Sequence, residues 1–130
     1  MTGLVLVTHA GLASALLRSA EMIIGAIDFC EQVEVAPDEH ADVIMSRVVA
    51  AVEKARKDGA IIMTDLFGGT PSNMAMSFLK DGQVEVLTGV NLPMVIEFSS
   101  KRGLMGVGEL AAELQKCGRE GIINAGEFLK

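Results

Sequence analysis

At 130 residues the chain is long enough for one domain, spanning residues 1–130, with a hydrophobic core of its own. Half of the residues are hydrophobic, the formal net charge is −6, and Trp and Tyr are absent. An acidic chain with neither a basic stripe nor aromatic stacking platforms is not expected to bind nucleic acid. No apolar stretch is long enough to cross a membrane and no basic segment opens a signal peptide, so we expect a cytoplasmic protein.

The cysteines and histidines are too few and too far apart to suggest a metal site. Cys30 and Cys117 fit neither a redox pair nor a zinc spacing, and we expect both to be reduced and buried. There are only two histidines, and His40 is expected to be a solvated or capping residue among acidic neighbours. The sequence therefore predicts neither a metal nor a cofactor.

Strand and helix patterns alternate along the chain. The first half predicts a strand over 3–8, a helix over 10–24, a strand over 29–35 and a helix that begins at 37–40 and ends before 58. The second half predicts a strand over 60–64, a helix from 70, a strand over 84–88, helices over about 93–101 and 108–118, and a short strand within 121–125. Such alternation is typical of an α/β fold whose mostly parallel sheet has helices on both faces. A mean hydropathy of +0.41 agrees with strands that are buried on both sides.

Two of the predicted helices give more detailed expectations. In the helix over 10–24, the spacing of Leu12, Leu16, Ala20 and Ile23 predicts the buried stripe. At the helix that begins near 70, Thr70 suits the N-cap and Pro71 the first helical position.

Polar residues follow three of the predicted strands: His9 the first, Asp65 the third and Asn91 the fourth. Ligands of open α/β sheets bind beyond the carboxyl ends of the strands, where the strand order reverses. In the flavodoxin-like order 2-1-3-4 that crevice lies between the first and third strands. We therefore expect His9 and Asp65 to meet there.

A carboxylate beside an imidazole fixes the tautomer and leaves the other ring nitrogen as a nucleophile. It also stabilises the positive charge that a new bond places on the ring. In the loop Leu66–Thr70, Gly68 and Gly69 allow close approach of the backbone, whose N–H groups can bind anionic oxygens, and Thr70 can add a hydroxyl. Together these residues indicate a phosphohistidine site.

Simpler readings of the same residues stay open. His9 can be a histidine without a special role, and Asp65 can cap a turn. The Gly-Gly-Thr-Pro sequence can be only a turn and a helix start, and Asn91 can be a helix cap. The coincidence of a histidine and an aspartate at two strand ends favours the functional interpretation.

The sequence contains no convincing nucleotide-binding motif. Residues 106–111 match the dinucleotide fingerprint on paper, but they follow no strand and lie too near the C-terminus for a complete βαβ unit. There is no Walker A sequence, because Gly68-Gly69 is not followed by Gly-Lys.

Four segments together resemble the IIA component of the mannose-family bacterial phosphotransferase system, along nearly the whole chain. They are Gly3–His9, Asp65–Asn73, Gly89–Met94 and Gly118–Gly121. One departure is Phe67, which stands where the family often has tryptophan.

The resemblance implies a phosphocarrier. His9 would accept a phosphoryl group from HPr and pass it to a IIB component, with Asp65 supporting His9 and the loop Leu66, Phe67, Gly68, Gly69 and Thr70 binding the phosphoryl oxygens. It also implies a homodimer, in which the last strand, around Ile122-Ile123, can be exchanged between subunits. Association with the membrane would be indirect, through IIC and IID. With no IIB domain in this sequence, the IIB partner is expected to be a separate protein.

Three alternatives remain at this stage. The same phosphorylation could serve regulation instead of transport. The chain could be the related subunit that phosphorylates dihydroxyacetone kinase, although that family's loop differs after the aspartate. It could also be a flavodoxin-like ligand-binding module without phosphoryl chemistry. Neither the sugar nor the phosphorylated imidazole nitrogen follows from the sequence.

Overall fold

The computed structural model describes residues 1–130 and contains one parallel four-stranded sheet in the order β2-β1-β3-β4. The strands are β1 (Gly3–His9), β2 (Cys30–Val35), β3 (Ala60–Thr64) and β4 (Val84–Thr88). The helices are α1 (Leu12–Ile24), α2 (Ala41–Ala55), α3 (Thr70–Met76), α4 (Leu92–Lys101), α5 (Val107–Glu120) and α6 (Ala125–Phe128). The predicted α/β class and strand order are confirmed.

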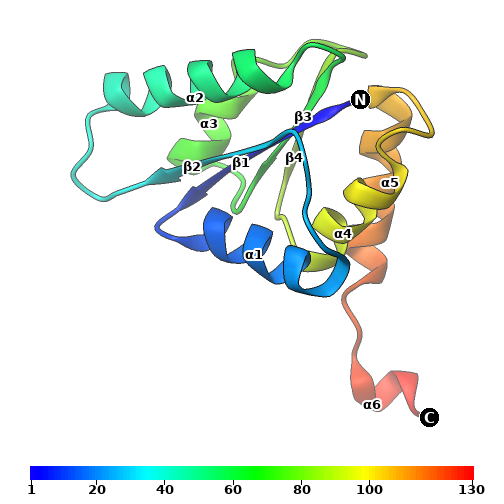
Figure 1. Cartoon of the computed structure of the whole chain (residues 1–130). Coiled ribbons are helices and arrows are strands. Elements are labelled where there is room, and N and C mark those ends of the chain that lie inside the picture. Colours follow the sequence, from blue (N-terminus) through cyan, green and yellow to red (C-terminus); the bar gives the residue numbers. More distant parts are fainter.

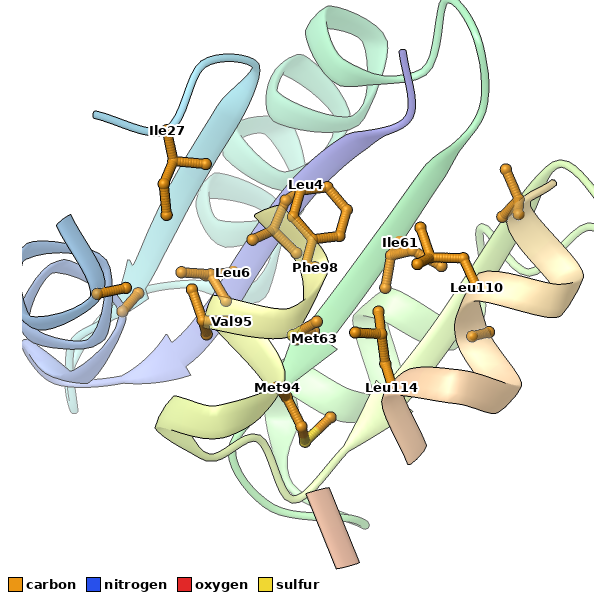
Figure 2. Packing of buried hydrophobic residues seen from close by; sticks show 14 residues of the cluster. Leu4, Leu6, Ile27, Ile61, Met63, Met94, Val95, Phe98, Leu110 and Leu114 are labelled. Atoms are coloured by element: carbon orange, nitrogen blue, oxygen red, sulfur yellow. The ribbon is translucent and has the colours of Figure 1, made fainter. Parts of the chain in front are cut away.

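Helices cover both faces of the sheet, with α2 and α3 on one side and α1, α4 and α5 on the other (Figure 1). Successive side chains of a strand point to opposite faces, so β1 supplies Leu4 and Leu6 to one core and Val5 and Val7 to the other. Figure 2 shows Leu4 of β1 and Phe98 of α4 among the residues of the first core. This double burial explains the apolar strands and the high hydropathy.

The predicted stripe of α1 is only partly buried. Ala13 and Ala20 are completely buried, whereas Leu12 is 42% and Ile23 62% exposed. The helix places its small residues and Leu17 against the core, because alanine allows close approach, whereas Leu12, Met22 and Ile23 are exposed. Periodicity identified the helix correctly but assigned part of its buried face wrongly.

The N-cap of the helix after β3 lies one residue earlier than predicted. Gly69 is the N-cap and Thr70 is the first residue of α3, with Pro71 in the first turn. Thr70 therefore does not cap the helix, and no side chain accepts a hydrogen bond there.

The predicted short strand within 121–125 is not formed. Helix α5 continues to Glu120, and Ala125–Phe128 form the short helix α6, which projects away from the sheet (Figure 1). Ile122 and Ile123 are 78% and 57% exposed. A strand needs a neighbour for its backbone groups, and no strand of the chain pairs with this tail.

Cys30 and Cys117 are free, as expected, but both are only partly buried, so the expectation that they are buried was wrong. Burial raises the pKa of the Cys30 thiol to about 12.

The buried Arg102 donates hydrogen bonds to the carbonyl oxygens of Thr2 and Asp28. These hydrogen bonds connect the end of α4 to the start of β1, a contact that the sequence did not predict.

No helix of the chain combines the length and the apolar character that crossing a membrane requires.

Candidate functional site

His9 and Asp65 meet at the carboxyl ends of the adjacent strands β1 and β3. Nδ1 of the His9 ring lies 3.0 Å from Oδ2 of Asp65, and the same oxygen accepts the backbone N–H of His9 at 2.9 Å. The Asp65 side chain is 13% exposed and that of His9 is 49% exposed. The carboxylate is thus shielded while the imidazole stays accessible, as a reactive histidine requires.

The turn after β1 is held by backbone and hydroxyl contacts. The N–H of Ala10 donates to the carbonyl oxygen of Val35 on β2 at 2.9 Å, and Ala10 has the left-handed φ of 48°. Oγ1 of the buried Thr8 accepts the N–H of Ala13 at 2.8 Å, near the start of α1. These bonds fix the backbone on both sides of His9.

The loop between β3 and α3 reaches the His9 ring through Gly69. A Cβ atom on Gly69 would lie 3.0 Å from Cε1 and 3.5 Å from Nε2 of His9. The loop backbone therefore passes along the ring edge that Asp65 does not occupy. Gly68 has a φ of 88°, which glycine adopts without strain.

The remaining residues of the predicted oxygen-binding loop lie around this contact. Leu66 and Phe67 are 62% and 71% exposed, and Thr70 is also exposed. Only Gly69 is seen directly against the ring, so the part played by the other loop residues stays a prediction.

Asn91 and His40 do not join the site. Asn91 is the N-cap of α4: its Oδ1 accepts the N–H of Met94 at 3.2 Å, and its Nδ2 donates to the carbonyl oxygen of Gly118 at 2.9 Å. The interpretation of Asn91 as a helix cap is confirmed. His40 is exposed at the start of α2 and makes no side-chain capping bond.

Glu34 is a third polar residue at this edge of the sheet, and the sequence interpretation missed it. It lies near the end of β2 and pairs in register with Thr8. Oγ of Ser14 donates to its Oε1 at 2.6 Å, and its Oε2 is buried without a hydrogen-bond partner. Its place near a strand end was the available signal. No three His, Cys, Asp or Glu side chains lie together as a metal site would require.

Comparison with known proteins identifies the family of the chain. The family described as PTS system fructose IIA component, EIIA-man, matches residues 3–115. The chain is similar to the PTS system sorbose-specific EIIA component of Lacticaseibacillus casei, with 32% identity over 118 residues that cover 90% of this chain and 86% of that protein. It is 31% identical over 122 residues to the PTS system mannose-specific EIIAB component of Escherichia coli strain K12, covering 92% of this chain but 38% of that longer protein.

A solved structure gives the same result. The mannose/sorbose specific IIA subunit of the phosphotransferase system from Enterococcus faecalis superimposes with a TM-score of 0.86 and 29% identity, covering 95% of this chain and 93% of that one. The chain therefore belongs to the EIIA-man family of phosphotransferase-system IIA components, which take part in phosphoryl transfer during sugar uptake.

Proposed function

We propose that this protein is a phosphocarrier that accepts a phosphoryl group on His9 from the phosphohistidine of HPr and passes it to a IIB component. The observation that carries the proposal is the hydrogen bond between Nδ1 of His9 and Oδ2 of Asp65, which combines an accessible imidazole with a shielded carboxylate. In this role the protein works in the cytoplasm and associates with the membrane only indirectly, through IIC and IID.

The geometry favours Nε2 of His9 as the phosphorylated nitrogen. With the ring proton on Nδ1 and shared with Asp65, Nε2 keeps its lone pair. As the Nε2–P bond forms, the P–N bond of the donor breaks and its electron pair stays on the donor nitrogen. The His9 ring gains positive charge in this step, and the carboxylate of Asp65 stabilises it. The phosphoryl group leaves for IIB by the reverse process.

The loop from Leu66 to Thr70 is the proposed binding site for the phosphoryl oxygens. Its support is the position of Gly69 against the Nε2 edge of the ring, where backbone N–H groups can approach a bound phosphoryl group. No side chain caps the first turn of α3, so its N–H groups remain available. The hydroxyl of the exposed Thr70 adds a donor.

Leu66 and Phe67 are proposed to contact the partner proteins. Both are more than half exposed beside a histidine that itself lies at the surface. Phe67 stands where the family often has tryptophan, so it keeps a shielding ring but lacks the indole N–H.

A direct labelling experiment tests the function. Incubation with phosphorylated HPr should give a stoichiometric, acid-labile phosphoryl group, detected by intact mass. His9→Ala should accept none, whereas His40→Ala should be labelled as the wild type is, because His40 lies outside the site. Labelling of the His9→Ala variant would contradict the proposal. Release of the group on addition of IIB would complete the cycle.

We further propose a homodimer in which the tail of one chain pairs with β4 of the other. β4 lies at the edge of the sheet, and a hollow of about 580 Å³ beside it is lined by β4 and α5, with Ile122 among its lining residues. The tail carries large exposed apolar side chains: Ile122, Ile123, Phe128 and Leu129. An edge strand offers unpaired backbone groups that an extended segment can satisfy.

Truncation tests this assembly. The full chain should have the mass of a dimer in light scattering, and a chain ending at Gly121 should be a monomer that keeps its circular-dichroism spectrum. A dimer that survives truncation would argue against pairing through the tail.

A further inference from the structure

Glu34 places a second carboxylate close to the strand end that carries His9. It is the neighbour of Thr8 in the β1–β2 register, one position before His9. A Cβ atom on Gly11 would lie 3.5 Å from its Oε2, so the carboxylate lies beside the turn between His9 and α1. His9 is therefore flanked by Asp65 on one neighbouring strand and by Glu34 on the other.

The charge of Glu34 is not neutralised by a cation. None of the ion pairs of the chain includes it. Arg47 donates to the backbone carbonyl oxygen of Glu34 at 2.9 Å, but its guanidinium is paired with the carboxylate of Glu39. The one side-chain partner of Glu34 is the neutral hydroxyl of Ser14.

Unlike Asp65, Glu34 makes no hydrogen bond to the His9 ring. It lies with Thr8 on the face of the sheet covered by α1, whereas the ring contacts Gly69 at the start of α3. Its influence on the ring is therefore through space. Adjacent strands are about 4.8 Å apart, which puts the carboxylate on the order of 10 Å from the imidazole.

We propose that Glu34 raises the phosphoryl-transfer potential of His9 by electrostatic repulsion; this inference rests on the phosphocarrier function proposed above. A phosphoryl group brings roughly two negative charges to the ring. Their repulsion by Glu34 raises the free energy of the phosphorylated form relative to the free form. Glu34 thereby favours delivery of the phosphoryl group to the acceptor over its retention on His9.

The equilibrium between phosphorylated HPr and this protein measures that potential. Glu34→Gln removes the charge and keeps an oxygen acceptor for Ser14. It should raise the equilibrium constant for phosphorylation of His9 by about threefold to tenfold, as expected for repulsion over this distance in a medium close to water. The difference should shrink as salt is added, because ions screen the interaction. Quantitative phosphoprotein gels or ³¹P NMR give the ratio of the two forms.

Two control variants separate charge from structure. Ser14→Ala breaks the same hydrogen bond but leaves the charge of Glu34 in place. Glu31→Gln removes one charge that is paired with Lys54 and lies about 10 Å along the same strand from Glu34, on the side away from the site. Both should leave the equilibrium constant within about 1.5-fold of the wild type, since neither removes the charge beside His9.

An unchanged constant in Glu34→Gln, or an equal shift in Ser14→Ala, would overturn the role of Glu34 while leaving the phosphocarrier function intact. Absence of any phosphorylation of the wild-type protein would instead refute the function itself and, with it, this inference.

Discussion

One oxygen of Asp65, Oδ2, accepts two hydrogen bonds from His9, from its backbone N–H at 2.9 Å and from its ring at 3.0 Å. The carboxylate thus holds both the end of β1 and the orientation of the imidazole. Its second oxygen, Oδ1, is buried without a partner.

Asp65→Ala should slow phosphorylation of His9 on the order of 10²-fold, because the ring loses both its orientation and the charge that stabilises the imidazolium form. Rapid-quench measurement of phosphoryl transfer from HPr gives the rate. Asp38→Ala removes an exposed carboxylate elsewhere and should leave the rate unchanged. An unaltered rate in Asp65→Ala would remove this residue from the mechanism.

Gly69→Ala should impair transfer while the fold is kept. The added methyl group would lie 3.0 Å from Cε1 of His9 and push the ring aside, and a misplacement of about 1 Å can cost up to 10²-fold in rate. Gly69 has a φ of −82°, which alanine adopts without strain, so the melting temperature should change little.

Gly68→Ala is the matched control for this substitution. Nothing lies within 4 Å of its added Cβ, but its φ of 88° is unfavourable for alanine. That variant should lose about 1 kcal/mol of stability and keep more of the transfer rate. A transfer rate that falls more in Gly68→Ala than in Gly69→Ala would show that the contact of Gly69 with the ring is unimportant.

Thr8→Val and Thr64→Val should differ although both threonines are completely buried on adjacent strands. Oγ1 of Thr8 accepts the N–H of Ala13, whereas Oγ1 of Thr64 has no partner. Thr8→Val should therefore cost about 1–3 kcal/mol, and Thr64→Val should be neutral or stabilising. Urea denaturation measures the free energy of unfolding of both variants. Equal losses of this free energy would show that the hydrogen bond of Thr8 contributes little to stability.

Ala10→Gly should stabilise the protein. Ala10 has a φ of 48°, a conformation that costs an L-residue with a Cβ about 1–2 kcal/mol and that glycine adopts freely. After the greater chain entropy of glycine is subtracted, a gain of about 0.5 kcal/mol remains. Ala15→Gly, inside α1, should instead lose about 1 kcal/mol. Chemical denaturation should show a higher free energy of unfolding for Ala10→Gly and a lower one for Ala15→Gly. A lower free energy of unfolding in Ala10→Gly would contradict the inference that Ala10 is strained.

Local sequence patterns were enough to predict the elements of the sheet. The apolar runs of β1 and β3 and the strand-helix alternation follow from the period of side chains and from turn residues, which act over a few positions. The same alternation limits the topology, so that the meeting of His9 and Asp65 could be predicted from two strand ends 56 residues apart. The buried face of α1 was predicted less well, because a helix with apolar residues on several sides has no unique buried stripe.

The sequence by itself determined which residues form the strands, which polar residues end them and which family the pattern resembles. Only the tertiary structure decided that Gly69 lies against the ring, that Glu34 stands on the other side of His9, and that the tail forms no strand within its own chain. The physical reason is that the first group depends on local backbone preference and side-chain period. The second group depends on strand register, on close packing between segments far apart in the chain, and on whether an edge has a partner.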